Sequence, residues 1–274
     1  MQALPFVFSL LVAVGLTPLV LSRLADAGLT RENYRGRPLP VPLGLVIVPV
    51  ALIALIPVML LARLTEADVY PDNLGFAVIF VPGVALLGLI DDVLSGAGRG
   101  WRGHGKDIMS GALSTGLLKA AGTLGLALLV ASSLPGSDSE FLLAAAVLVL
   151  ATNAFNLLDL RPGRSVKGFV LLGLGLTIAT QNTEALAGLG LFIAPVLVAG
   201  FYDLREKAML GDVGSNAIGA LAGLWIVLTM DSNGQLIALA VLFLLNLFGE
   251  FRSISNVIEK VPGLRHLDSL GRPG

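Results

Sequence analysis

Cysteine is absent from the sequence of 274 residues, which excludes disulfide bonds and thiolate metal sites. Charge is also scarce, since only 14% of the residues are charged, whereas soluble domains carry about 25%. The formal net charge of −1 provides no basic field that would attract nucleic acid. The only histidines are His104 and His266, and neither has a serine or cysteine at a spacing that indicates a nucleophilic triad.

Apolar residues take the place of the missing charge, at 55% of the chain with a mean hydropathy of +0.86. This composition predicts an all-α, polytopic membrane helix bundle, because each crossing needs about 20 apolar residues and lipid cannot satisfy backbone groups. We expect a single domain over residues 1–274, and a first segment that is a retained span because no basic region precedes it. The nine expected transmembrane helices cover residues 3–22, 41–62, 74–90, 109–132, 140–156, 166–181, 184–201, 214–230 and 235–251.

The distribution of lysine and arginine predicts the orientation of these helices. Of the 18 basic residues, 16 follow odd-numbered segments, and the positive-inside rule places those loops in the cytoplasm. The N-terminus is then outside and the C-terminus inside. We therefore expect a multi-pass protein of the inner (plasma) membrane whose active site faces the cytoplasm. The two exceptions are Arg63, on the opposite side, and Lys119, within the fourth segment.

Three polar motifs fall on the predicted cytoplasmic side, and the first is the pair Asp91-Asp92 at the end of the third segment. Carboxylates near hydrocarbon are costly and indicate a functional role, and the negative end of a helix dipole does not stabilise them. A bound cation or a proton-transfer role would explain their position. The alternative is an ordinary solvated helix end.

The second motif combines Asn153, Asn156 and Asp159, which are spaced three residues apart. On a helix these side chains form one ridge, with each about 60° round from the last, which suits a shared ligand. The alternative is hydrogen bonding between helices, a common use of asparagine in membrane bundles.

The third motif, Gly211-Asp212-Val213-Gly214-Ser215, lies at the start of the eighth segment. Its glycines allow close backbone approach, and a helix start offers free N–H groups to an anion. Asp212 beside them is a candidate ligand for magnesium, which takes few carboxylates and shares phosphate oxygens. A simple capping turn is the alternative. Together, the carboxylates, the basic residues and the glycine-rich turn predict magnesium-assisted chemistry on a phosphorylated substrate.

The order, spacing and membrane side of the motifs resemble the polyprenyl-phosphate N-acetylhexosamine-1-phosphate transferases, which include the phospho-MurNAc-pentapeptide translocase and the GlcNAc-1-phosphate transferases. Members of this family have an Asp-Asp pair after the third helix and an Asn-x-x-Asn-x-x-Asp motif after the fifth. They also have a Gly-Asp-x-Gly-Ser motif with a lysine upstream, which here is Lys207. The resemblance extends over most of the chain.

The resemblance implies transfer of a sugar-1-phosphate, expected to be a HexNAc-1-phosphate, from a UDP-sugar to a polyprenyl phosphate with release of UMP. It implies magnesium, or manganese in its place, as cofactor. Such enzymes perform phosphoryl transfer, in which alignment and charge neutralisation do most of the work. By position, Asp212 would bind the metal, and Asp91, Asp92 and Asp159 would be catalytic. The candidate substrate-binding residues are Asn153, Asn156, Lys106, Lys119, Arg161, Arg164, Lys207, Gly211, Gly214, Ser215 and His266.

The sequence also departs from the family pattern. Pro162 stands where the family has a second aspartate, and Met209 stands where an aromatic side chain can stack on uracil. Thr123 replaces a glutamine that follows the lysine of the fourth helix, and His266 is all that corresponds to a His-rich motif. Because these changes fall at nucleotide and sugar contacts, we expect a divergent branch with the same reaction type.

Two other functions are open on the sequence alone. A non-catalytic membrane protein that binds lipid or a partner protein would explain the changed nucleotide contacts, but it leaves the carboxylates near hydrocarbon unexplained. A transporter would carry charges inside its spans, and Lys119 is the only clear instance. Separately, the small residues Ser215, Gly219 and Gly223 predict close helix packing, either within one chain or in a homodimer.

Overall fold

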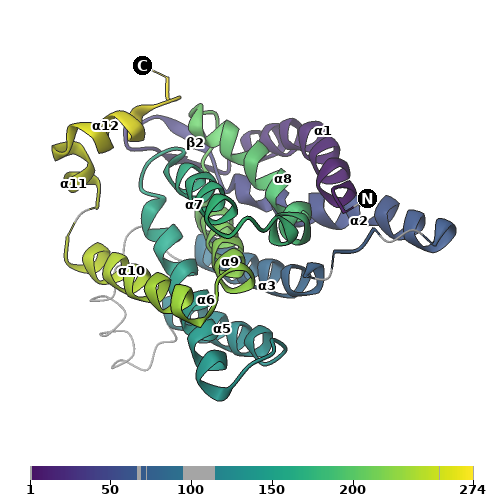
Figure 1. The fold of residues 1–274 in the computed structure, drawn as a ribbon. Helices are drawn as coiled ribbons and strands as arrows, with labels where there is room; N and C mark the ends of the chain where they lie inside the picture. The colour runs from purple at the N-terminus through teal and green to yellow at the C-terminus, as the bar shows by residue number, and fades with distance from the viewer. Residues whose placement is uncertain (1, 67–68, 72, 95–114, 253, 274) are drawn as a thin grey trace.

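The computed structural model describes residues 2–66, 69–71, 73–94, 115–252 and 254–273. The described chain is almost entirely helical (Figure 1). A short antiparallel hairpin of β1 (Thr30–Glu32) and β2 (Pro38–Pro40) and the 3-10 turn η1 (Leu43–Val46) separate the first two helices. The helices are α1 (Leu4–Asp26), α2 (Ile47–Thr65), α3 (Leu74–Leu94), α5 (Thr115–Ala131), α6 (Asp138–Leu158), α7 (Arg164–Thr180), α8 (Glu184–Leu204), α9 (Gly211–Thr229), α10 (Ser232–Phe251), α11 (Ile254–Lys260) and α12 (Pro262–Ser269).

The apolar segments expected from the sequence coincide with these helices. Each segment overlaps one long helix, and the fourth is described from residue 115 onward as α5. Within the described residues, seven helices are long and apolar enough to cross a membrane, namely α1, α2 with η1, α3, α6, α8, α9 and α10. Helices α5 and α7 are shorter, with 17 residues each. The all-α membrane bundle is thus confirmed, whereas the nine crossings and their orientation stay predictions.

Helix α9 lies at the centre of the bundle. It packs on α3 and α6 and also contacts α7, α8 and η1, and every residue from Val213 to Val227 is buried. Close approach requires a glycine at position 219, because a Cβ atom there would lie 2.6 Å from the Cα atom of Thr152 in α6. The run of small residues predicted from the sequence therefore packs within the chain.

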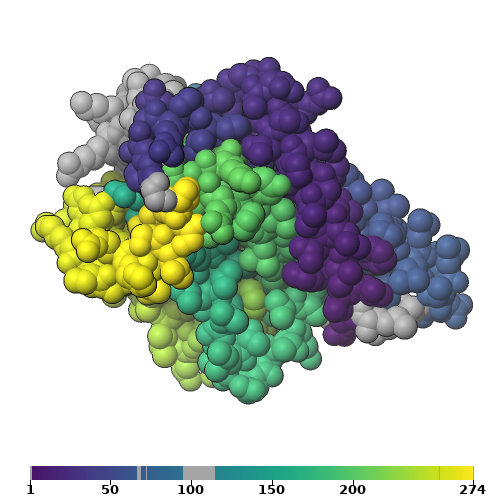
Figure 2. Space-filling model, turned by 90° about the horizontal axis from the view of Figure 1, so that it is seen from above, coloured from purple at the N-terminus to yellow at the C-terminus, as the bar shows by residue number. Residues whose placement is uncertain are grey.

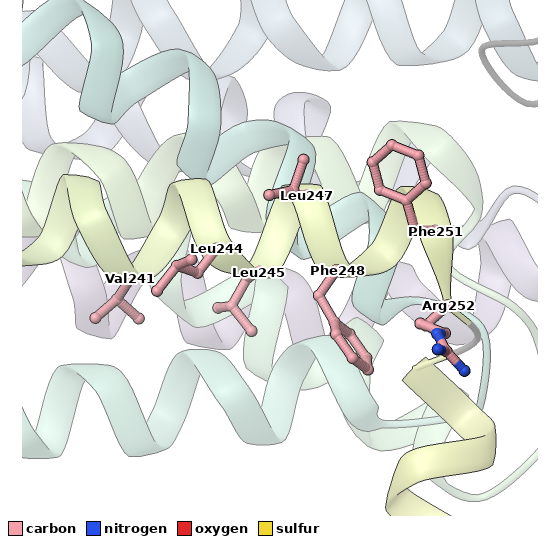
Figure 3. Close-up of a pocket in the computed structure, with 7 residues that line it drawn as sticks. All are labelled: Val241, Leu244, Leu245, Leu247, Phe248, Phe251 and Arg252. Carbon is pink, nitrogen blue, oxygen red and sulfur yellow. The ribbon is translucent and has the colours of Figure 1, made fainter.

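Helix α10 lies at the edge of the bundle and packs mainly on α6. The two helices begin side by side, where the Ser232 hydroxyl donates a hydrogen bond to Glu140 Oε1 at 2.6 Å. Leu242 is the only buried residue of α10. The outer face of the helix carries a shallow apolar pocket of about 530 Å³. Figure 3 shows Val241, Leu245 and Phe248 pointing to the same side of the helix. Apolar side chains facing outward in this way match a lipid environment.

The C-terminal helices α11 and α12 fold back over the end of the bundle that carries the motif loops. Figure 2 shows this segment (yellow) lying against the green surface around the end of α8. The Arg272 guanidinium donates a hydrogen bond to the carbonyl oxygen of Pro162 at 2.7 Å. The Arg35 guanidinium, in the hairpin, donates a hydrogen bond to the carbonyl oxygen of Pro273 at 3.1 Å. The tail, the hairpin and the loop after α6 therefore meet at one end of the molecule.

Candidate functional site

Lys119 lies at the centre of a polar cluster at this end of the bundle. Its Nζ donates hydrogen bonds to Asp91 Oδ2 at 3.3 Å and to Asp212 Oδ2 at 2.7 Å. In the amide orientation that satisfies all its neighbours, the Asn156 oxygen accepts from Nζ at 3.0 Å and its nitrogen donates to Asp212 Oδ1 at 3.2 Å. That nitrogen also donates to the Ser215 hydroxyl at 2.9 Å. We call Asp91, Lys119, Asn156, Asp212 and Ser215 the Lys119 cluster; it unites residues of all three sequence motifs.

Helix ends bring these groups together. Asp212 lies in the first turn of α9, where the positive end of the helix dipole stabilises a carboxylate. Asp91 lies among the last described residues of α3, and Lys119 is the fifth described residue of α5. The contact between the two side chains pairs a negative with a positive charge where both are largely buried.

The donor set of the Lys119 cluster suits a hard divalent cation. Oxygens of Asp91, Asp212 and Asn156 already surround one positive charge, the Lys119 ammonium. Asp212 is the most accessible of the charged members, with 33% of its side chain exposed, against 17% for Asp91. Within the described residues, no group of three acidic, histidine or cysteine side chains forms a complete metal site. Magnesium commonly takes only one or two carboxylates together with substrate phosphates, and Asp212 with Asp91 could supply these.

Asp92 has a different position from its neighbour Asp91. Its side chain is only 4% exposed, and its Oδ2 accepts a hydrogen bond of 3.0 Å from the backbone N–H of Val213. Arg31 Nη1 lies 3.8 Å from the other carboxylate oxygen. An N–H group at the start of α9, which we expected to be free for a substrate anion, is therefore used by the chain's own carboxylate. Asp92 anchors the turn that carries Asp212.

The side chains of Asn153, Asn156 and Asp159 each contact a different neighbouring part of the bundle. Asn153 Nδ2 donates to Asn246 Oδ1 of α10 at 2.5 Å, which is the interhelical bond that the sequence left as an alternative. Asp159 Oδ1 accepts from the Ser165 hydroxyl of α7 at 3.1 Å. Only Asn156 reaches the Lys119 cluster, because each step of three residues turns the side chain by about 60°.

Asp159 follows the last residue of α6, outside the apolar span. Removal of its carboxyl group from water raises its pKa well above the ordinary value, and the nearby carboxylate of Asp203 raises the pKa further. The Ser165 hydrogen bond acts in the opposite direction but is outweighed. Asp159 therefore takes up a proton more readily than an exposed aspartate.

The other basic candidates that the structure describes lie outside the Lys119 cluster. Arg164 is buried, and its Nε and Nη2 donate to the two oxygens of Asp268 at 2.9 and 3.1 Å. Arg161 pairs with Glu259 and covers the ring of Tyr34. Lys207 is exposed, and its Nζ lies 5.6 Å from the centre of the Tyr202 ring. His266 is exposed on α12. Lys106 falls outside the described residues.

The backbone of η1 lies directly against the Gly-Asp-x-Gly-Ser motif. The N–H groups of Leu43 and Gly44 donate to the carbonyl oxygens of Met209 and Leu210 at 2.8 and 2.9 Å. A Cβ atom on Gly44 would collide with the backbone N and Cα atoms of Gly214. Gly214 thus serves packing against η1, and Gly211 begins the helix that carries Asp212.

Two further carboxylates, Asp203 and Asp268, were not predicted from the sequence. Asp203, in the last turn of α8, is 3% exposed and accepts backbone hydrogen bonds from the loops that carry two of the motifs. An acidic residue at the end of an apolar helix is the signal that singled out Asp91 and Asp92, so Asp203 could have been found in the same way. Asp268 has one local partner, Arg272 four residues later, but its contact with Arg164, 104 residues earlier, leaves no signal in the sequence.

Comparison with known proteins gave no match, either to a protein-family model or to a curated protein.

Proposed function

We propose that this chain transfers a sugar-1-phosphate, namely an N-acetylhexosamine-1-phosphate, from a UDP-sugar to a polyprenyl phosphate and releases UMP. The observation that carries the proposal is the Lys119 cluster, in which Asp91, Asn156 and Asp212 surround a single positive charge. These residues come from the three motifs whose order resembles the transferase family. A position where oxygen atoms surround a cation suits phosphoryl transfer, because neutralisation of the phosphate charge accounts for much of the catalysis of that reaction.

In this reaction an oxygen of the acceptor phosphate attacks the β-phosphorus of the UDP-sugar, and the bond from that phosphorus to the UMP oxygen breaks. UMP leaves with the electron pair of the broken bond. When bound, magnesium would neutralise charge on the diphosphate and on the departing UMP. Asp212 and Asp91 would hold it, and Asn156 would keep the Asp212 carboxylate in place through its hydrogen bond. Asp92 would fix the first turn of α9, which carries Asp212.

The membrane setting of the proposal follows the charge distribution. We infer nine crossings in the inner (plasma) membrane, with the N-terminus outside and the Lys119 cluster on the cytoplasmic side, where the nucleotide-sugar is available. A polyprenyl acceptor keeps its tail in lipid and brings only its phosphate to the helix ends. The seven apolar helices support the bilayer environment. A homodimer is compatible with this function but is not needed for it.

A non-catalytic protein that binds lipid or a partner is the second candidate. It is favoured by the internal use of residues that a transferase would direct at substrate: Asn153 bonds to Asn246, and Arg164 is held by Asp268. Under that alternative, the cluster would be an internal ion pair that stabilises the helix ends. The two candidates differ in whether the protein turns over a nucleotide-sugar.

The experiment is UMP release by the purified full-length protein with magnesium, undecaprenyl phosphate and a panel of UDP-N-acetylhexosamines. We expect release with one donor and a loss of at least about 100-fold in Asp212→Asn, the scale of removing one charge-stabilising group from an active site. Asp26→Asn, which changes an exposed carboxylate at the end of α1, is the matched control and should keep full activity. Folded protein that releases no UMP with any donor would favour the non-catalytic candidate.

A further inference from the structure

We propose that Lys119 is a resident counter-cation: its ammonium occupies the position between Asp91 and Asp212 that a divalent metal ion takes, so that the two cations compete for one place. The inference deepens the proposed function and rests on it only in treating the Lys119 cluster as the metal site. It adds that the metal-free site is closed by the chain's own charge and that metal binding must displace Lys119.

The contacts of the ammonium are those of a metal ligand set. Nζ lies 2.7 Å from Asp212 Oδ2, 3.0 Å from the Asn156 oxygen and 3.3 Å from Asp91 Oδ2. All three are hard oxygen donors, and a magnesium ion would bind such oxygens at about 2.1 Å. An ion held by all three oxygens would have to lie among them, where the ammonium now lies. Two positive charges so close in a partly buried site repel strongly, so both cannot occupy it.

The burial of Lys119 favours a role in the cluster. Only 13% of its side chain is exposed, so water solvates the ammonium poorly. Asp91 and Asp212 compensate for this lost hydration, and in return the ammonium keeps the two carboxylates from repelling each other.

Displacement is feasible because lysine has a long and flexible stem. Asp212, with a third of its side chain exposed, is the oxygen donor that an incoming ion meets first. Once the ion holds Asp212 and Asp91, Lys119 loses its partners and is released close to the phosphates that the ion carries. The same side chain thus neutralises carboxylates in the metal-free protein and phosphate in the loaded one.

The test measures manganese binding to the full-length protein in detergent by electron paramagnetic resonance, with no substrate present. Lys119→Met removes the competing charge and keeps most of the apolar stem. We expect it to bind Mn²⁺ about tenfold more tightly than the unaltered protein, a modest share of the repulsion between neighbouring charges. Lys260→Met, which removes an exposed lysine from α11, controls for net charge and should not change the affinity.

Two further variants locate the effect. Lys119→Arg keeps the charge and should bind Mn²⁺ as weakly as the unaltered protein does. Asp212→Asn added to Lys119→Met should abolish the gain. If Lys119→Met fails to fold, Lys119→Gln provides the same comparison with a shorter polar side chain. Unchanged or weaker Mn²⁺ affinity in folded Lys119→Met or Lys119→Gln, including no binding at all, overturns the inference.

The outcomes also separate this inference from the proposed function. Metal-dependent UMP release by the unaltered protein, with no gain of affinity in Lys119→Met, would refute the competition alone. A gain of affinity without UMP release under any condition would leave Lys119 as a counter-cation in a protein that is not this transferase.

Discussion

The backbone N–H of Gly163 donates a hydrogen bond of 2.5 Å to the carboxylate of Asp203, 40 residues further along the chain. The second oxygen of Asp203 accepts from the N–H of Leu210 at 3.3 Å. One buried carboxylate therefore holds the loop after α6 to the loop before α9. Asp159 lies in the first of these loops and Asp212 directly follows the second, so the relative position of two motifs depends on Asp203.

Replacing Asp203 with alanine should therefore lower both stability and activity. The change leaves two buried N–H groups without partners, and each such group costs about 1–3 kcal/mol. We expect the free energy of unfolding to fall by about 3 kcal/mol and UMP release to fall with it. Chemical unfolding in detergent, followed by circular dichroism, measures the first. Asp203→Asn keeps one acceptor oxygen and should lose less; equal stability of all three proteins would contradict this role.

Gly44→Ala should disrupt the contact between η1 and the start of α9. The added methyl group would meet the backbone of Gly214, which cannot rotate away as a side chain can. We expect a loss of about 3 kcal/mol in the free energy of unfolding, at the upper end of overpacking effects. Gly125→Ala is the control, because its Cβ atom would meet nothing within 4 Å. That variant should match or slightly exceed the unaltered protein in thermal stability, since alanine favours a helix more than glycine does.

Asp268 should contribute strongly to attachment of the C-terminal helices. It pairs with Arg164 and Arg272, and all three side chains are at most 10% exposed. Breaking a buried ion pair by removing one partner costs about 3–5 kcal/mol. Asp268→Asn should therefore lose about 3 kcal/mol in unfolding experiments at pH 7 and should expose the tail to limited proteolysis. Asp231→Asn, at the opposite end of the bundle, should leave the tail protected.

The same ion pair predicts a dependence of stability on pH. Burial alone would raise the pKa of Asp268, but the hydrogen bonds and charges of Arg164 and Arg272 outweigh it and hold the pKa well below its ordinary value. Its stabilising contribution is thus fully present above the unfolded-state pKa of about 4 and is lost as the pH falls through the folded-state value. The difference in unfolding free energy between the unaltered protein and Asp268→Asn should be constant from pH 8 to about 5 and shrink only in stronger acid.

Asp159 should show the opposite dependence. Its pKa is raised by burial and by Asp203, so its favourable contribution exists below the unfolded-state pKa and is lost as the pH rises through the folded-state value. Asp159→Asn should be more stable than the unaltered protein at pH 8, with the difference vanishing towards pH 4. If Asp159 is catalytic, the variant should also lose UMP release, a trade of activity for stability. A variant that is less stable at every pH would contradict the buried-carboxylate account.

The helices were predictable because a membrane span leaves its signal in composition, and each expected apolar segment overlaps a helix of the described residues. The site was predictable in part. Asp91, Asn156 and Asp212 do come together, since motifs at helix ends on one side of a bundle are brought close by any compact packing. The different positions of Asn153 and Asn156 were not predictable, because they depend on which neighbour each side chain faces.

The ion-pair partners of the basic residues could not be predicted from the sequence either. Arg161 and Arg164 follow a motif aspartate, which suggested substrate phosphates, but their guanidinium groups meet Glu259 and Asp268 in the C-terminal helices. Such pairs join residues about 100 positions apart, and no local pattern marks them. The hairpin of β1 and β2 likewise depends on distant support, because the Glu206 carboxylate accepts hydrogen bonds from Asn33 and Tyr34.

The central position of α9 has a consequence for biosynthesis. Of the seven helices that could span a membrane, α9 is the least apolar and the most enclosed by protein, so lipid alone gives it the weakest support. Its main neighbours, η1, α3, α6, α7 and α8, all precede it in the chain. The helices that surround α9 are therefore synthesised before it. A helix that would insert poorly alone can then enter the bilayer by packing against these neighbours.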